Sequence, residues 1–296
     1  MGGPQPHPPI HPGLAHLADH EEGRAWLARL PRLIQESAER WSLVFGDAFP
    51  YAFASLALLA TLPGGLSAVL KVQYPGRESD HEAAALERWA GDGAIRLLAH
   101  DPERHALLLE RCEPGTPLSD LPQDEALDVV AGLLPRLWVP AGEPFRPLAD
   151  EAAWWAGYLP RAWERAGKPF ERRLLDAALD ALATLPASQG EQVLLHQDLH
   201  AANVLRATRE PWLAIDPKPL TGEREFGVAA MIRGGELGEG PANVRHRLDR
   251  LSADLGLDRE RARGWALAQT LAWAVDDDVD EVDADQVETA RQLSAM

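Results

Sequence analysis

A chain of 296 residues, of which 46% are hydrophobic, is long enough to bury one or two cores without disulfide bonds. Its single cysteine, Cys112, excludes an internal disulfide framework and fits a reducing cytoplasm. The formal net charge of -17 argues against a nucleic-acid partner and is compatible with a small cationic substrate. No apolar run is long enough to span a membrane, so we expect a soluble cytoplasmic protein without a membrane partner. The oligomeric state stays open.

The first part of the chain is predicted to form a small antiparallel sheet with a covering helix. Residues 1–20 are rich in proline, which is typical of a flexible lead and not of a signal peptide. An amphipathic helix is expected at 21–40, and a Pro-Gly-Gly turn at 62–65 joins two strands in a hairpin. The pattern further predicts strands at 41–45, 52–61, 66–74, 95–99 and 106–112, with a helix at 78–90.

A lysine interrupts the apolar run of the third predicted strand. A buried ammonium group without a partner is costly, so Lys71 is expected to need an acidic neighbour. The helix that follows offers Glu82 and Glu87, and the helical pattern alone does not choose between them. Kinases use such a strand lysine, held by a glutamate of the next helix, to bind the nucleotide phosphates. The plain alternative is an edge-strand lysine with two solvated glutamates.

A Pro- and Gly-rich stretch around residues 113–117 separates the β-rich part from a helix-rich part. We therefore predict a first lobe at 21–112 that binds nucleotide. A mainly helical second lobe at 113–296 is expected to carry the catalytic loop and the substrate site. Helices are expected at 123–139, 150–166, 170–184, 227–234, 242–255, 259–275 and 284–295.

A polar cluster between apolar strands indicates phosphoryl-transfer chemistry. Asp198 and Asn203 have the spacing at which a kinase loop places its catalytic base and a metal-binding amide. Asp216 ends the next short apolar stretch, where a second metal ligand is expected. A competing interpretation takes His196, Asp198 and His200 as zinc ligands, but none of the other eight histidines lies in a comparable apolar-flanked position at a strand end to complete such a site. His196 is better interpreted as a residue that orients the loop.

Several motifs together resemble the aminoglycoside and hydroxyurea resistance kinases, especially the streptomycin 6-phosphotransferase type, over nearly the whole chain. The most family-specific is Asp-Pro-Lys-Pro at 216–219, where general kinases carry Asp-Phe-Gly. The resemblance implies a two-lobed, protein-kinase-like α+β fold. It also implies transfer of a phosphoryl group from ATP, with Mg²⁺, to a hydroxyl of an aminoglycoside such as streptomycin. The other supporting stretches are 68–72, 81–83, 93–98, 106–111 and 194–205.

By this resemblance each key residue has an implied role. Lys71 would bind the nucleotide phosphates with Glu82 as its partner. Asp198 would be the catalytic base, with His196 beside it. Asn203 and Asp216 would hold Mg²⁺. The main chain around Glu110, Arg111 and Cys112 would bind adenine.

Three departures from the family pattern leave alternatives open. Gln197 stands where the family usually has glycine, and the phosphate-covering stretch 49–55 contains no glycine, so Ser55 would contact phosphate through its hydroxyl. The stretch 225–227 lacks the usual acid after its aromatic residue, so support for the loop comes from Glu225 or from elsewhere. A kinase for an amino alcohol or sugar, or a nucleotide-binding pseudokinase, is therefore kept as an alternative.

Candidate substrate contacts lie in the second lobe. Trp154 and Trp155 are adjacent on a predicted helix and cannot both face inward, so one of them is expected to line the substrate site, and Trp155 is the candidate contact. Asp276 and Asp277 begin an acidic run that could bind substrate amines, although a solvated loop is the simpler interpretation of most of the run. His200 is the remaining candidate.

Overall fold

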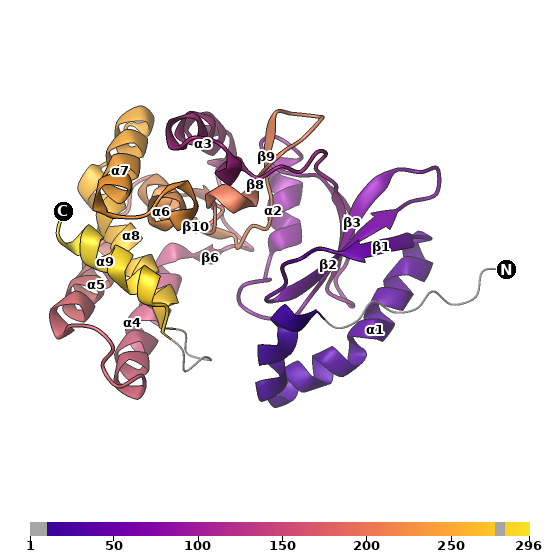
Figure 1. Ribbon diagram of the computed structural model, residues 1–296, viewed down its shortest axis with the longest axis horizontal. Helices are drawn as coiled ribbons and strands as arrows, with labels where there is room; N and C mark the ends of the chain where they lie inside the picture. The colour runs from indigo at the N-terminus through magenta and orange to yellow at the C-terminus, as the bar shows by residue number, and fades with distance from the viewer. Residues whose placement is uncertain (1–10, 276–281) are drawn as a thin grey trace. The chain divides into compact units, whose positions relative to one another are not determined.

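The computed structural model describes residues 11–275 and 282–296, and the chain divides into two compact units, residues 1–113 and 114–296 (Figure 1). Each unit has secondary structure of its own kind: a five-stranded sheet with helices in the first, and mainly helices in the second. Within the described residues, no helix is both long and apolar enough to cross a bilayer.

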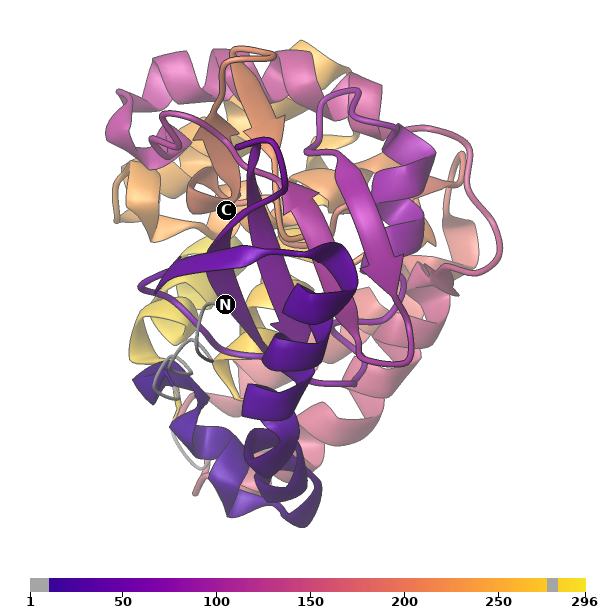
Figure 2. The same ribbon diagram turned by 90° about the vertical axis from the view of Figure 1, so that its right-hand side faces the viewer.

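Unit 1 is built on an antiparallel sheet with the strand order β1-β2-β3-β5-β4. Helix α1 (Glu21–Trp41) covers one face of this sheet and shares a core with residues of β2, β3 and β5 (Figure 2). Leu70 and Val72 point into that core, so Lys71 between them points to the opposite face. The strands are β1 (Val44–Ala48), β2 (Ser55–Thr61), β3 (Ser67–Gln73), β4 (Leu97–Asp101) and β5 (Ala106–Glu110).

Helix α2 (Glu82–Trp89) begins later than the pattern predicted. The hydroxyl of Ser79 donates to the carbonyl oxygen of Tyr74 at 2.8 Å, which holds the preceding residues in a turn. His81 then adopts a left-handed backbone conformation with φ 67°, which no helix interior allows. The side chain of Glu82 therefore stands at the start of the helix.

The expected flexible lead at 1–20 is wrong for its described part. Pro12–Asp19 forms a 3₁₀ helix, in which Leu14 is 0% exposed and Leu17 is 7% exposed. Both side chains belong to the core beneath α1, because two leucines three residues apart lie on one face of such a helix. Proline content suggested disorder, whereas the apolar spacing was the better indicator.

Unit 2 is built around the buried helix α8 (Arg259–Ala274), which packs against α5, α6, α7 and α9. The predicted helix at 227–234 is in fact a 3₁₀ turn, Arg224–Val228, followed by the short α6 (Ala229–Arg233). The other helices are α3 (Gln123–Leu137), α4 (Leu148–Arg165), α5 (Arg172–Thr184), α7 (Pro241–Leu255) and α9 (Ala284–Ser294).

Two small sheets carry the polar loop of unit 2. Strand β10 (Leu220–Gly222) lies between β6 (Arg146–Pro147) and β7 (Val193–Leu195), and β7 is completely buried. Strands β8 (Val204–Arg206) and β9 (Trp212–Ala214) form a separate antiparallel pair. The loop from β7 to β8 and the segment from β9 to β10 therefore start and end in the same region of the unit.

Candidate active site

In unit 1, Lys71 forms a buried ion pair with Glu82. Lys71 Nζ lies 2.6 Å from Glu82 Oε2, and the two side chains are 8% and 2% exposed. Gln73, two residues further along the same face of β3, donates from Nε2 to the same oxygen at 2.7 Å. The structure thus pairs Lys71 with Glu82 and not with Glu87, because the first turn of α2 faces the sheet.

The other residues expected near nucleotide lie at strand ends in unit 1. Ser55 is the first residue of β2 and lies opposite Gln73. Glu110 ends β5 and accepts a hydrogen bond at Oε2 from the main-chain N–H of Arg96 at 2.9 Å. Cys112 is half-buried. Their contacts with nucleotide stay predictions.

In unit 2, the loop after β7 turns sharply at Gln197. This residue has φ 66°, in the left-handed region that favours glycine, at a cost of about 1–2 kcal/mol for a side-chain-bearing residue. The main-chain N–H of Asp198 donates to the carbonyl oxygen of His196 at 2.8 Å, which closes the turn. Gln197 therefore holds a glycine-like backbone conformation, which adds local strain at this turn.

The β8–β9 pair brings Asn203 and Asp216 close together. The N–H of Ile215 donates to the carbonyl oxygen of Asn203 at 2.9 Å, and Asp216 follows directly with φ 57°. Asn203 Nδ2 donates to the carbonyl oxygen of Asp198 at 2.9 Å, so the amide oxygen is the atom of this side chain able to bind a cation. One carboxylate and one amide oxygen suit Mg²⁺, which usually takes its other ligands from water and phosphates.

The zinc interpretation does not fit this region. Across 11–275 and 282–296, the structure contains no group of three or more His, Cys, Asp or Glu side chains arranged to hold a metal. His196 instead points into the protein, where its Nε2 donates to the carbonyl oxygen of Ile215 at 2.9 Å. Burial lowers the pKa of His196 to about 4, so the imidazole is neutral at pH 7.

Two cations approach the carboxylate of Asp198. Arg233 Nη2 donates to Oδ1 at 2.9 Å, and Lys218 Nζ lies 3.3 Å from Oδ2. Both cations also lie over the indole ring of Trp273. The distance to the ring centroid is 4.3 Å from Arg233 Cζ and 4.9 Å from Lys218 Nζ. The sequence pattern did not identify Arg233. Lys218 stood within the recognised Asp-Pro-Lys-Pro motif without an assigned role.

His200 lies in the same loop and forms a polar pair with Glu236. Its Nδ1 lies 2.7 Å from Glu236 Oε1, and both side chains are partly exposed. Burial raises the pKa of Glu236, but the hydrogen bond and charge of His200, together with Arg233, outweigh it and hold this pKa below its ordinary value. Glu236 therefore keeps a negative charge at pH 7.

The prediction that Trp155 contacts the substrate is wrong. Trp155 is 0% exposed and packs on Phe226 at a ring distance of 6.0 Å, whereas its neighbour Trp154 is 43% exposed. Adjacent side chains diverge around helix α4, and tertiary packing buries the second tryptophan while leaving the first partly in solvent. Asp276 and Asp277 lie outside the described residues.

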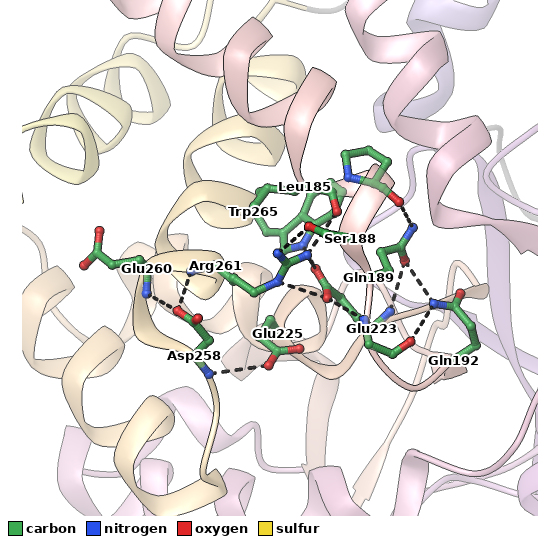
Figure 3. Close-up of polar contacts among 12 residues, drawn as sticks. Leu185, Ser188, Gln189, Gln192, Glu223, Glu225, Asp258, Glu260, Arg261 and Trp265 are labelled. Carbon is green, nitrogen blue, oxygen red and sulfur yellow. Dashed lines mark hydrogen bonds and ion pairs between the residues drawn. The ribbon is translucent and has the colours of Figure 1, made fainter.

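Structural support for the loop region comes from Glu223 and not from Glu225. Glu223 is 1% exposed, and its Oε1 accepts from Arg261 Nη2 at 2.7 Å and from the indole N–H of Trp265 (Figure 3). This carboxylate directly follows β10, so it ties the end of the Asp216 segment to α8. Glu225 instead accepts a hydrogen bond from the main-chain N–H of Asp258 at 3.4 Å.

Comparison of the sequence with known proteins finds matches along most of the chain. The pattern of the family described as "Aminoglycoside/hydroxyurea antibiotic resistance kinase" matches residues 40–280. A streptomycin 6-kinase of Streptomyces glaucescens is 41% identical over 283 residues, which are 92% of this chain and 92% of that protein. A hydroxyurea phosphotransferase of Kitasatospora aureofaciens is 41% identical over 263 residues, covering 86% and 76% of the two chains.

A solved structure is similar in fold at low sequence identity. It is a thermostable mutant of an aminoglycoside phosphotransferase in a ternary complex with ADP and hygromycin B. The TM-score is 0.57 at 17% identity, and the match covers 88% of this chain and 96% of that one. The shared fold is that of the protein-kinase-like phosphotransferases.

Proposed function

Because the chain belongs to the aminoglycoside/hydroxyurea antibiotic resistance kinase family, we propose that it transfers the γ-phosphoryl group of ATP to the 6-hydroxyl group of streptomycin. The observation that supports this most strongly is the 41% identity to a streptomycin 6-kinase along 92% of both chains. A net charge of -17 also suits a cationic acceptor. A single cysteine is typical of a protein in the reducing cytoplasm, where ATP is present, so this location is consistent with the proposed activity.

Phosphoryl transfer depends on positioning and charge neutralisation more than on covalent chemistry. Asp198 would accept the proton of the attacking hydroxyl group. Lys71, held by Glu82, would bind the nucleotide phosphates. Asn203 and Asp216 would hold Mg²⁺, which when bound neutralises phosphate charge. The main chains at these last two residues are joined at the end of the β8–β9 pair, where the N–H of Ile215 donates to the carbonyl oxygen of Asn203, which supports this assignment.

The acceptor would contact the partly exposed pair of His200 and Glu236. Glu236 keeps its negative charge at pH 7 and would attract a guanidinium group of streptomycin. Asp276 and Asp277 stay predicted contacts for the same groups. Ser55 and the main chain near Glu110 and Cys112 stay predicted contacts for the nucleotide.

The test is ATP consumption by the purified protein with Mg²⁺ and a panel of acceptors. The panel contains streptomycin, other aminoglycosides, hydroxyurea, amino alcohols and sugars, and NMR of the product locates the phosphate. Asp198→Asn removes the base and should lower kcat by about 10²–10⁴-fold. Asp176→Asn, at an exposed carboxylate of α5, is the matched control and should leave kcat unchanged.

Each result has a definite meaning. Turnover with streptomycin that needs Asp198 and yields a 6-phosphate supports the proposal. Turnover with hydroxyurea, or with an amino alcohol or sugar alone, would refute the assigned acceptor. Nucleotide binding without turnover on any acceptor would refute the activity and favour a pseudokinase.

A further inference from the structure

A closed ring of polar contacts links the side chain of Asp198 to its own main chain. Arg233 donates from Nη2 to Asp198 Oδ1 at 2.9 Å, and its Nε donates to Gln269 Oε1 at 3.3 Å. Gln269 Nε2 in turn donates to the carbonyl oxygen of Gln197, the residue before Asp198, at 3.0 Å. We propose that Arg233 and Gln269 are positioning residues that fix the orientation of the catalytic carboxylate.

Burial explains why the ring requires these residue types. Gln269 is 0% exposed on α8, a helix whose other buried residues are mostly apolar, and a buried amide without partners is unfavourable. The contacts to Arg233 and Gln197 use both its amide oxygen and its amide nitrogen. Trp273 lies four residues further along α8, on the same side of the helix, and its indole carries the guanidinium group of Arg233 at 4.3 Å.

The contacts of Arg233 and Lys218 fix the plane of the Asp198 carboxylate as well as its position. The terminal torsion of an aspartate has a broad energy profile, so packing alone orients its oxygens weakly. Arg233 holds Oδ1 and Lys218 approaches Oδ2 at 3.3 Å, which together define the plane. A reacting group displaced by about 1 Å can lose about 10²-fold in rate. The inference rests on the proposed function, since this orientation matters for rate only if Asp198 is the base.

Two variants separate the parts of the ring. Arg233→Lys keeps the positive charge but loses the planar fork that reaches both Asp198 and Gln269. Gln269→Met keeps the side-chain length and loses both hydrogen bonds. The matched control is Arg172→Lys, because Arg172 on α5 also stacks on an indole, that of Trp163, at 5.8 Å.

The experiment measures kcat, the KM for streptomycin and for ATP, and the melting temperature of each variant, and determines crystal structures of the two ring variants. We expect kcat to fall about 10-fold or more in both, with each KM within about twofold of the unmodified protein. The crystals should show the Asp198 carboxylate rotated. Arg172→Lys should keep kcat.

Two results would overturn the inference. One is an unchanged Asp198 orientation in both variant crystals. The other is a loss of kcat that disappears when the assay temperature is well below the melting temperature, which would indicate a structural role only. If the unmodified protein has no acceptor-dependent turnover, the proposed function is refuted, whereas the crystal structures still decide whether the ring orients Asp198.

Discussion

The buried histidine of the loop that follows β7 should make the protein less stable in mild acid. His196 is 3% exposed and has a pKa of about 4 in the folded chain, below the ordinary value of 6.5 expected after unfolding. Between these two values the unfolded chain binds more protons than the folded one. The stabilisation from neutral His196 is therefore complete above pH 6.5 and is lost as the pH falls from 6.5 towards 4.

The size of this effect follows from the two pKa values. Each pH unit inside the window costs about 1.4 kcal/mol, so a fall from pH 6.5 to pH 5 should lower the free energy of unfolding by about 2 kcal/mol. Ordinary carboxylates remain mostly ionised above pH 5 and add little. Burial also lowers the pKa of His100, which contributes in the same direction. A comparison with a variant is therefore needed to isolate His196.

The assay is urea unfolding followed by tryptophan fluorescence at pH 7 and pH 5. His196→Gln retains an amide N–H near the position of Nε2 and has no proton to gain, so its free energy of unfolding should change by about 2 kcal/mol less than that of the unmodified protein. Equal pH dependence in His196→Gln and the unmodified protein would refute the reasoning.

Three further predictions concern stability and are measured by urea unfolding. Glu82→Ala should lower the free energy of unfolding by about 3–5 kcal/mol, because it removes the carboxylate that faces buried Lys71. Glu82→Gln should lower it less, and the reverse order of the two variants would contradict the ion pair. Trp155→Ala should cost about 3–5 kcal/mol and Trp154→Ala clearly less, so equal losses would contradict their assigned burial. Leu14→Ala should cost about 2–5 kcal/mol, whereas no change would place that segment outside the core.

The family and the two-lobed fold class were predictable from local patterns, and both are confirmed. The spacing of apolar residues located most of the helices and strands, because this spacing is set by residues that are neighbours in the sequence. It failed where another preference was stronger, as at Leu14, where abundant proline hid a buried 3₁₀ helix. It also failed at Trp155, because helical spacing shows that adjacent side chains diverge but not which one faces the core.

The sequence by itself determined which groups can carry phosphoryl-transfer chemistry and that Asn203 and Asp216 come together, because a short loop and one strand pair connect them. The family resemblance already implied Glu82 as the partner of Lys71, and the structure shows that pair. Only the tertiary structure decided that Arg233 binds Asp198 and that Gln269 binds both Arg233 and the carbonyl oxygen of Gln197. Arg233 and Gln269 come from two helices, and their meeting depends on how α6 packs against α8. Local spacing controls contacts within a turn or hairpin, whereas contacts between distant elements depend on how the whole core packs.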